Sequence, residues 1–164
     1  MVGEACAADN APAVDVLLVC SAGGHLLQLY LLGEAWAGLS CSWVTLERED
    51  SKMLEGERVY YAYGPTERNL PNLFRNIFFA VKLMRRLRPK VIVTTGAGLA
   101  VPFAWVGRCF GARIVYIESL TRIEQPSLSY RLARPVVDRV YVQWPDLIPS
   151  VPEARYVGNV LKRT

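Results

Sequence analysis

Several features that would assign a function directly are missing from this sequence of 164 residues. Its single histidine and four cysteines, which include no Cys-x-x-Cys pair, do not have the spacing of a zinc site. We therefore expect no metal and reduced, mostly structural cysteines. No basic residue precedes an apolar core near the N-terminus, so nothing predicts export, and we expect a cytoplasmic chain. The length suits one domain.

A long uninterrupted apolar stretch is also absent, although 52% of the residues are hydrophobic. One long uncharged run, residues 91–107, is broken by small polar and glycine residues at 94–98 and by Pro102. A strand, a loop and a buried helix therefore explain this run better than a membrane-spanning helix does.

The sequence does contain an alternation of short β-branched runs and helical segments. Strands are predicted at 14–20, 41–46, 58–63, 91–95, 113–118, 139–143 and 155–157, and helices at 25–36, 71–88, 99–110 and 127–133. This alternation predicts an α/β fold, a single Rossmann-like domain with a parallel sheet covered on both faces. The domain should occupy residues 14–160, between a flexible N-terminus at 1–13 and a C-terminal tail at 161–164.

Ligands of open α/β sheets bind at the turns that follow the strands, and three such turns carry candidate residues. In the first, Ser21, Gly23 and Gly24 precede a helix, where free N–H groups favour a phosphate or a developing anion. His25 follows, and the positive end of the helix disfavours its charged form, which makes it a candidate general base. The alternative is a structural role, either as an N-terminal helix cap or in a structural hydrogen bond.

A dinucleotide site competes with this interpretation, because Glu47 ends the second strand, roughly where a ribose-binding carboxylate belongs. The chain continues after Gly24 without the third glycine of the G-x-G-x-x-G fingerprint. We therefore expect no nicotinamide or other cofactor, and we interpret Glu47 as a solvated turn charge.

The second turn, residues 94–98, again places small residues before a helix. Thr95, Gly96 and Gly98 are candidates for holding a diphosphate or for letting two surfaces approach closely, and a tight strand-to-helix turn is the alternative.

In the third turn a carboxylate, Glu118, emerges from an apolar strand. It can orient a sugar hydroxyl or act as a base, whereas Arg122 can pair with a phosphate or simply with Glu118.

The helix predicted at 71–88 is basic and unusually apolar. Residues 71–90 include six cations and no acidic residue, and two neighbouring apolar stripes exceed what one core-facing stripe requires. We interpret it as a helix at an anionic membrane surface, with contacts from Phe74, Arg75, Phe78, Lys82, Arg85 and Arg86. A core helix with a solvated basic side is the alternative. No stacking platform accompanies the cations, so nucleic acid is not an expected partner.

Four motifs in order resemble a known family: residues 21–25, residues 94–98 with Val101-Pro102 after them, residues 117–119 and residues 157–159. They resemble the bacterial capsule and exopolysaccharide proteins of the PssD/CpsF type. Those proteins are similar to the membrane-anchoring subunit of the eukaryotic dolichol-linked N-acetylglucosaminyltransferase, and more distantly to the N-terminal half of the peptidoglycan enzyme that makes lipid II. The resemblance covers residues 14–160.

The resemblance implies the N-terminal, acceptor-side half of a GT-B glycosyltransferase that is split into two chains. It implies inverting transfer from a nucleoside-diphosphate sugar, bound by the partner chain, to a polyprenyl-diphosphate-linked saccharide at the inner face of the plasma membrane. The turn with His25 and the strand end with Glu118 would then line the cleft. Residues 1–13 do not supply the spanning helix of the eukaryotic relatives, so the basic helix would provide the anchor.

Two other functions remain open at this point. One is a non-catalytic scaffold that recruits a self-sufficient partner enzyme to the membrane. The other is a stand-alone nucleotide-binding enzyme of the Rossmann type.

Overall fold

The computed structural model describes residues 13–161 and contains one parallel sheet with the strand order β3-β2-β1-β4-β5-β6-β7. The strands are β1 (Val16–Val19), β2 (Cys41–Leu46), β3 (Val59–Ala62), β4 (Val91–Thr94), β5 (Arg113–Ile117), β6 (Arg139–Val142) and β7 (Arg155–Tyr156). The predicted α/β class and parallel sheet are confirmed. A flexible N-terminus was predicted at 1–13 and a C-terminal tail at 161–164. Of these segments, residues 1–12 and 162–164 lie outside the described part of the chain.

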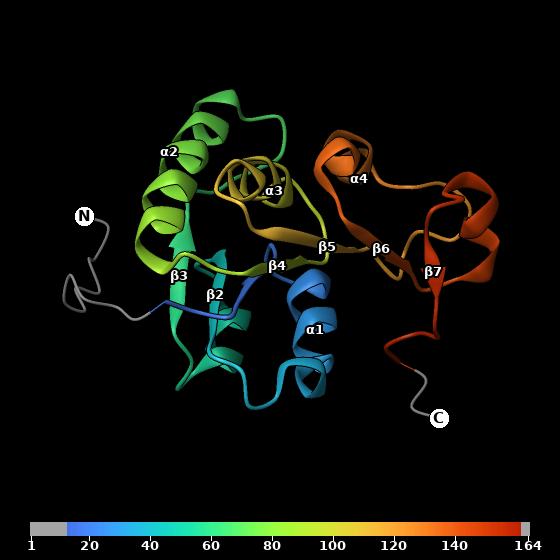
Figure 1. Ribbon diagram of the computed structural model, residues 1–164, viewed down its shortest axis with the longest axis horizontal. Coiled ribbons are helices and arrows are strands. Elements are labelled where there is room, and N and C mark those ends of the chain that lie inside the picture. The colour runs from blue at the N-terminus through green and yellow to red at the C-terminus, as the bar shows by residue number, and fades with distance from the viewer. Residues whose placement is uncertain (1–12, 162–164) are drawn as a thin grey trace.

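Helices cover both faces of the sheet. Three of them, α2 (Leu70–Leu87), α3 (Ala100–Cys109) and α4 (Leu128–Ala133), lie on one face, and α1 (Gly24–Leu31) lies on the other (Figure 1). The prediction of a single helix at 25–36 is wrong in the length of that helix. The α-helix ends at Leu31, and a 3-10 turn, η1 (Gly33–Trp36), follows. Gly33 is unfavourable inside a helix because its backbone loses the most freedom on folding.

The strands carry apolar side chains on both faces because each face has its own core. Leu17 and Val19 of β1 pack with Phe103 of α3 and the other residues under α2, α3 and α4. Leu18, the residue between them, packs with Leu26 and other residues on the α1 side. All four residues of β1 are therefore buried, as expected of a central strand.

The strand order reverses direction between β1 and β4. These strands are neighbours in register, with Val19 opposite Thr94, so the turns that follow them lie side by side at the carboxyl edge of the sheet. This position is the topological switch point, where ligands of open α/β sheets bind.

The structure shows which stripe of α2 faces the core. The buried residues of the helix are Asn72, Asn76, Ala80, Leu83, Met84 and Leu87. Phe74 and Phe78, two of the residues predicted to contact a membrane, lie outside this stripe and are 59% and 74% exposed. The two asparagines decide this rotation, because Asn76 exchanges two hydrogen bonds of 2.9 Å with the backbone of Tyr63, and Asn72 donates to Pro65 O.

Candidate functional site

Reciprocal hydrogen bonds join the first and second turns across the switch point. His25 Nδ1 lies 2.7 Å from Thr95 O, and Thr95 Oγ1 donates to His25 O at 2.8 Å. A carbonyl oxygen only accepts, so Nδ1 of His25 donates and carries the proton. In the neutral ring Nε2 is then the basic nitrogen. Within residues 13–161, Nε2 has no hydrogen-bond partner, so the ring can accept a proton there.

The first turn is open beside its leading glycine. Gly23 has φ +78°, and a Cβ added to it would meet no atom within 4 Å. Its N–H donates to the carboxylate of Asp50, which belongs to the short helix η2 (Glu49–Leu54). Sequence reasoning missed Asp50, because its charged segment was interpreted only as a turn. The protein's own carboxylate thus lies at the N-terminus of α1, where an anion was predicted to bind.

The second turn is closed by the domain's own packing. A Cβ on Gly96, where φ is +98°, would lie 2.5 Å from the hydroxyl of Tyr116. A Cβ on Gly98 would lie 2.9 Å from Thr66 O. Both glycines are therefore explained without a ligand, as in the alternative of a tight strand-to-helix turn.

Glu118 follows β5 directly and is 1% exposed. One carboxylate oxygen accepts from Ser119 N at 2.9 Å, and the other accepts from Ser127 N at 2.9 Å and Ser127 Oγ at 3.0 Å. These hydrogen bonds compensate the burial of a charge. The hydroxyl of Ser127 also caps α4 by accepting from Tyr130 N.

Tyr116 connects this cluster to the second turn. Its hydroxyl lies 3.2 Å from Ser127 Oγ and directly beneath Gly96. Because Ser127 Oγ donates its proton to Glu118, the tyrosine must be the donor in the contact with Ser127. Burial raises the pKa of Tyr116 far above the usual tyrosine value, and the nearby charge of Glu118 adds to this effect, so the phenol keeps its proton. Glu118 therefore supports the turn that holds His25.

The other residues of the first and third turns that were predicted to bind a ligand are more accessible. Arg122 is exposed, and in the described part of the chain it forms no salt bridge with Glu118. Ser21 is half-buried, and its hydroxyl makes a 3.5 Å contact with Ala22 O. Cys20, which precedes the first turn, is no candidate nucleophile, because burial raises the pKa of its thiol to about 12.

A pair of buried glutamines, which sequence reasoning did not identify, lies behind the first and third turns. Gln28 Oε1 accepts from Leu120 N and from Gln143 Nε2, both at 2.8 Å. No local motif marks these two residues, because the first lies in α1 and the second follows β6, 115 positions later in the chain.

The proposed membrane contacts lie along the outer side of α2. Phe74, Phe78, Lys82 and Arg85 are exposed, Arg86 is half-buried, and the guanidinium of Arg75 stacks over the ring of Tyr63 at 5.8 Å. No helix within residues 13–161 has the length and apolar character needed to cross a bilayer.

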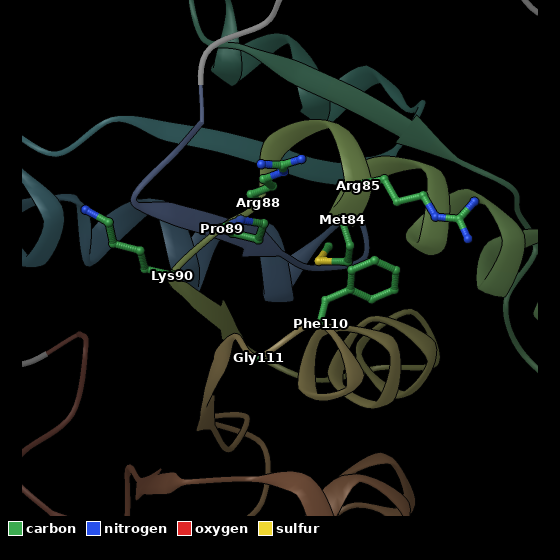
Figure 2. A pocket seen from close by; sticks show the side chains of 7 residues that line it. All are labelled: Met84, Arg85, Arg88, Pro89, Lys90, Phe110 and Gly111. Carbon is green, nitrogen blue, oxygen red and sulfur yellow. The ribbon is translucent and has the colours of Figure 1, made fainter.

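A pocket of about 670 Å³ lies away from the three turns, at the amino edge of the sheet (Figure 2). Met84 and Phe110 form its apolar part, and the side chains of Arg85 and Lys90 point away from each other. Lys90 is also bound to Asp15 at 2.7 Å. Arg85 and Lys90 therefore do not converge on one ligand in this pocket.

Comparisons with known proteins identify relatives of the chain. The family described as "Oligosaccharide biosynthesis protein Alg14 like" matches residues 65–160, which is more than half of the chain. The UDP-N-acetylglucosamine transferase subunit ALG14 of Candida albicans is 35% identical over 100 residues, which cover 57% of this chain and 45% of that protein. The Eremothecium gossypii protein of the same name is 36% identical over 118 residues, covering 66% and 53%. The chain thus spans about half the length of these relatives.

Solved structures with the same fold are longer as well. MurG of Acinetobacter baumannii matches with a TM-score of 0.72 at 16% identity, over 88% of this chain and 45% of that one. The UDP-GlcNAc 2-epimerase of Methanocaldococcus jannaschii matches with a TM-score of 0.66 at 11% identity, over 88% and 45%. These likenesses concern the fold alone, and they agree with the predicted half of a GT-B architecture.

Proposed function

The chain belongs to the Alg14-like family of oligosaccharide biosynthesis proteins, and from this premise we propose that it is the acceptor-binding, membrane-associating subunit of a two-chain inverting glycosyltransferase. The predicted similarity to the eukaryotic transferase subunit is confirmed by its relatives. The more specific assignment to the bacterial PssD/CpsF type, and with it a role in capsule or exopolysaccharide synthesis, stays a prediction.

The observation that carries the proposal is the fixed orientation of His25 at the switch point. Its Nδ1 is held by Thr95 O, so Nε2 is the nitrogen available to accept a proton. In an inverting transfer, the acceptor hydroxyl oxygen bonds to the anomeric carbon of the donor sugar and its proton passes to Nε2. The bond from that carbon to the diphosphate breaks, and the electron pair leaves with the nucleoside diphosphate. General-base assistance of this kind typically contributes about a hundredfold or more.

Glu118 is the second candidate for the base. Its burial and its three hydrogen bonds from Ser119 and Ser127 favour a supporting role over direct contact with an acceptor. We therefore propose neither of the two functions that its sequence position suggested, base or direct orientation of a sugar hydroxyl, but support of the second turn through Ser127 and Tyr116.

The acceptor we propose is a polyprenyl-diphosphate-linked saccharide. Its diphosphate would lie between the open side of Gly23 and the exposed Arg122, because Gly96 and Gly98 are already packed against the protein. The donor sugar nucleotide would lie mainly on the partner chain. Two relatives carry the name of UDP-N-acetylglucosamine transferase subunits, so UDP-N-acetylglucosamine is the first donor to test.

Membrane association would use the outer side of α2. Phe74 and Phe78 are exposed in the N-terminal half of the helix, and Lys82 and Arg85 are exposed in its C-terminal half. An exposed apolar stripe flanked by cations suits the interface of an anionic bilayer. We propose peripheral attachment at the inner face of the plasma membrane.

The split-enzyme proposal is tested by steady-state transfer from labelled UDP-N-acetylglucosamine to a synthetic polyprenyl-diphosphate-linked sugar. Each chain is assayed alone and then both together, with the donor-binding chain taken from the same genome. We expect negligible transfer by this chain alone and activity from the pair, because a donor held on one side only is poorly positioned. Full activity of the single chain would favour the stand-alone enzyme.

The scaffold alternative predicts a different result in the same assay. A scaffold would tolerate His25→Ala without loss of turnover, provided that the two chains still co-purify. The partner interface we expect lies at the carboxyl edge and near residues 157–164, of which 157–161 are described.

Membrane attachment is tested by co-sedimentation with phosphatidylserine vesicles at low and high salt. Replacing Lys82 and Arg85 with Glu should release the protein, since each surface cation contributes about 1 kcal/mol. The matched control is the same change at Arg113 and Arg139, which are exposed on β5 and β6. Equal loss from both variants, or no retention of the wild type, would mean that α2 is not the membrane contact.

A further inference from the structure

Gln143 lies at the end of β6 and is buried, with 3% of its surface exposed. Its Nε2 donates to Gln28 Oε1 at 2.8 Å and to Glu118 O at 3.0 Å. Its Oε1 accepts from Val160 N at 3.2 Å. This one side chain therefore contacts the third turn, α1 and the C-terminal segment 157–161.

Gln28 extends these contacts to the first turn. Its Nε2 donates to Gly24 O at 2.9 Å, and its Oε1 accepts from both Gln143 and Leu120 N. Trp144 Nε1 adds a donor to Leu120 O at 2.7 Å. The third turn is thus held from α1 and from the end of β6.

The polar atoms of both glutamine side chains are engaged inside the protein. Gln28 is 6% exposed, so water does not readily replace a lost partner. If Val160 moves, either Gln143 Oε1 loses its hydrogen bond from Val160 N, or the side chain of Gln143 rotates to keep it. Rotation would break the hydrogen bonds that Gln143 Nε2 donates to Gln28 and Glu118. A displacement of the C-terminal segment is therefore transmitted to Gly24 and Leu120 through two side chains.

We propose that Gln143 is a positioning residue that couples the C-terminal segment to the first and third turns of the cleft. The inference rests on the proposed function, in which this segment lies at the interface with the donor-binding chain. Binding of the partner there would then align the turn that carries His25, and the acceptor would be held well only in the assembled enzyme.

The coupling itself is measured in the isolated full chain, by hydrogen exchange of the Leu120 amide. Val160→Pro removes the N–H that donates to Gln143 Oε1, and Val160→Ala keeps it. We expect exchange at Leu120 to accelerate about five- to tenfold in Val160→Pro, the scale of one buried hydrogen bond. Exchange should stay at the wild-type rate in Val160→Ala. Unchanged exchange in Val160→Pro would overturn the proposal, because Leu120 would then not sense the C-terminal segment.

A second variant covers the case in which the proline change disrupts the fold. Gln143→Glu keeps an oxygen for Val160 N but removes the donors to Gln28 and Glu118. It should accelerate exchange at Leu120 as strongly as Val160→Pro. Tyr130→Phe, which loses one hydrogen bond of 2.8 Å to Glu153 elsewhere in the domain, serves as the stability-matched control. Equal acceleration in Tyr130→Phe would overturn the proposal by showing a merely global effect.

The consequence for catalysis is measured in the two-chain transfer assay. At saturating partner, Gln143→Glu should raise the acceptor KM about tenfold, the upper end of the same scale, and change kcat less. A lower partner affinity with an unchanged acceptor KM would overturn the coupling and leave the segment a simple docking element. If the wild-type pair shows no transfer, the proposed function fails, whereas the exchange measurements still decide whether the coupling exists.

Discussion

The two glycine turns at the switch point look alike in sequence but differ in what surrounds them. Gly23 of the first turn faces open space, whereas Gly96 of the second turn lies against the hydroxyl of Tyr116. Both have positive φ angles, so both need glycine for the backbone. Only the second also needs it for packing.

This difference separates a surface for ligands from the support beneath it. The second turn is held from below by Tyr116 and Ser127, and it holds His25 through Thr95. The first turn carries His25 and leaves room beside Gly23. Similar small-residue motifs can therefore serve one site in two different ways. Four substitutions, in order of decreasing expected effect, test this comparison.

Gly96→Ala should cause the largest loss of stability. The added Cβ would lie 2.5 Å from Tyr116 Oη, and the φ of +98° disfavours alanine. Overpacking and backbone strain together should lower the free energy of unfolding by about 3–4 kcal/mol, measured by urea denaturation.

The cause of that loss can be separated by a double-mutant cycle with Tyr116→Phe. Removing the hydroxyl leaves Tyr116 Cζ, at 3.3 Å, as the nearest atom and should recover part of the stability. Strictly additive losses would show that the packing contact with Tyr116 is not the reason for glycine at this position.

His25→Ala should lower turnover of the two-chain enzyme about a hundredfold, equivalent to about 2.7 kcal/mol in the activation barrier. His25→Asn is the matched variant, because its amide can still donate to Thr95 O but has no basic nitrogen in place of Nε2. We expect His25→Asn to be more stable than His25→Ala, because it keeps the hydrogen bond to Thr95 O, but to show the same low turnover. Recovery of turnover in His25→Asn would assign His25 to the structural support of the turns.

Gly23→Ala should have a smaller effect on stability than Gly96→Ala. No atom lies within 4 Å of the added Cβ, so only the backbone conformation, with φ 78° and ψ −140°, opposes alanine. We expect a loss of about 1–2 kcal/mol. Gly33→Ala, which also meets no atom but has no positive φ, is the control. A loss as large as that of Gly96→Ala would contradict the open environment of the first turn.

Asp50→Asn should change ligand binding rather than folding. It removes a negative charge beside Gly23 N while keeping an oxygen that accepts from it. Binding of inorganic pyrophosphate to the chain, measured by calorimetry, should strengthen about two- to fivefold. Glu49→Gln, an exposed change in a residue that pairs with Lys52, is the control. Equal affinities of Asp50→Asn and wild type would place the diphosphate elsewhere than the first turn.

Most of the fold was predictable from the sequence. Each β-branched run predicted as a strand is one in the structure, with ends shifted by a few residues, and the α/β alternation predicted the parallel sheet. The length of α1 was mispredicted because Gly33 lies inside an otherwise helical pattern. These features depend on neighbouring residues, which a local pattern describes well.

The candidate site was predictable only in part. The positions of His25, Thr95 and Glu118 after their strands follow from the alternation, but their partners do not. The burial of Glu118 depends on Ser127, which the polar loop after β5 brings back to it. Asp50 and the two glutamines were missed, since no short motif connects residues so far apart in the chain.

The sequence by itself determined the strands and helices, the parallel sheet and the turns where a ligand can bind, because these follow from hydrophobic period and turn residues within short windows. Only the tertiary structure decided the rotation of α2, the proton position on His25 and the connection from Val160 to Gly24. Each of these depends on hydrogen bonds between segments that the fold brings together, such as the pair His25 and Thr95, 70 positions apart. A local pattern contains no information about which distant group satisfies a buried donor or acceptor.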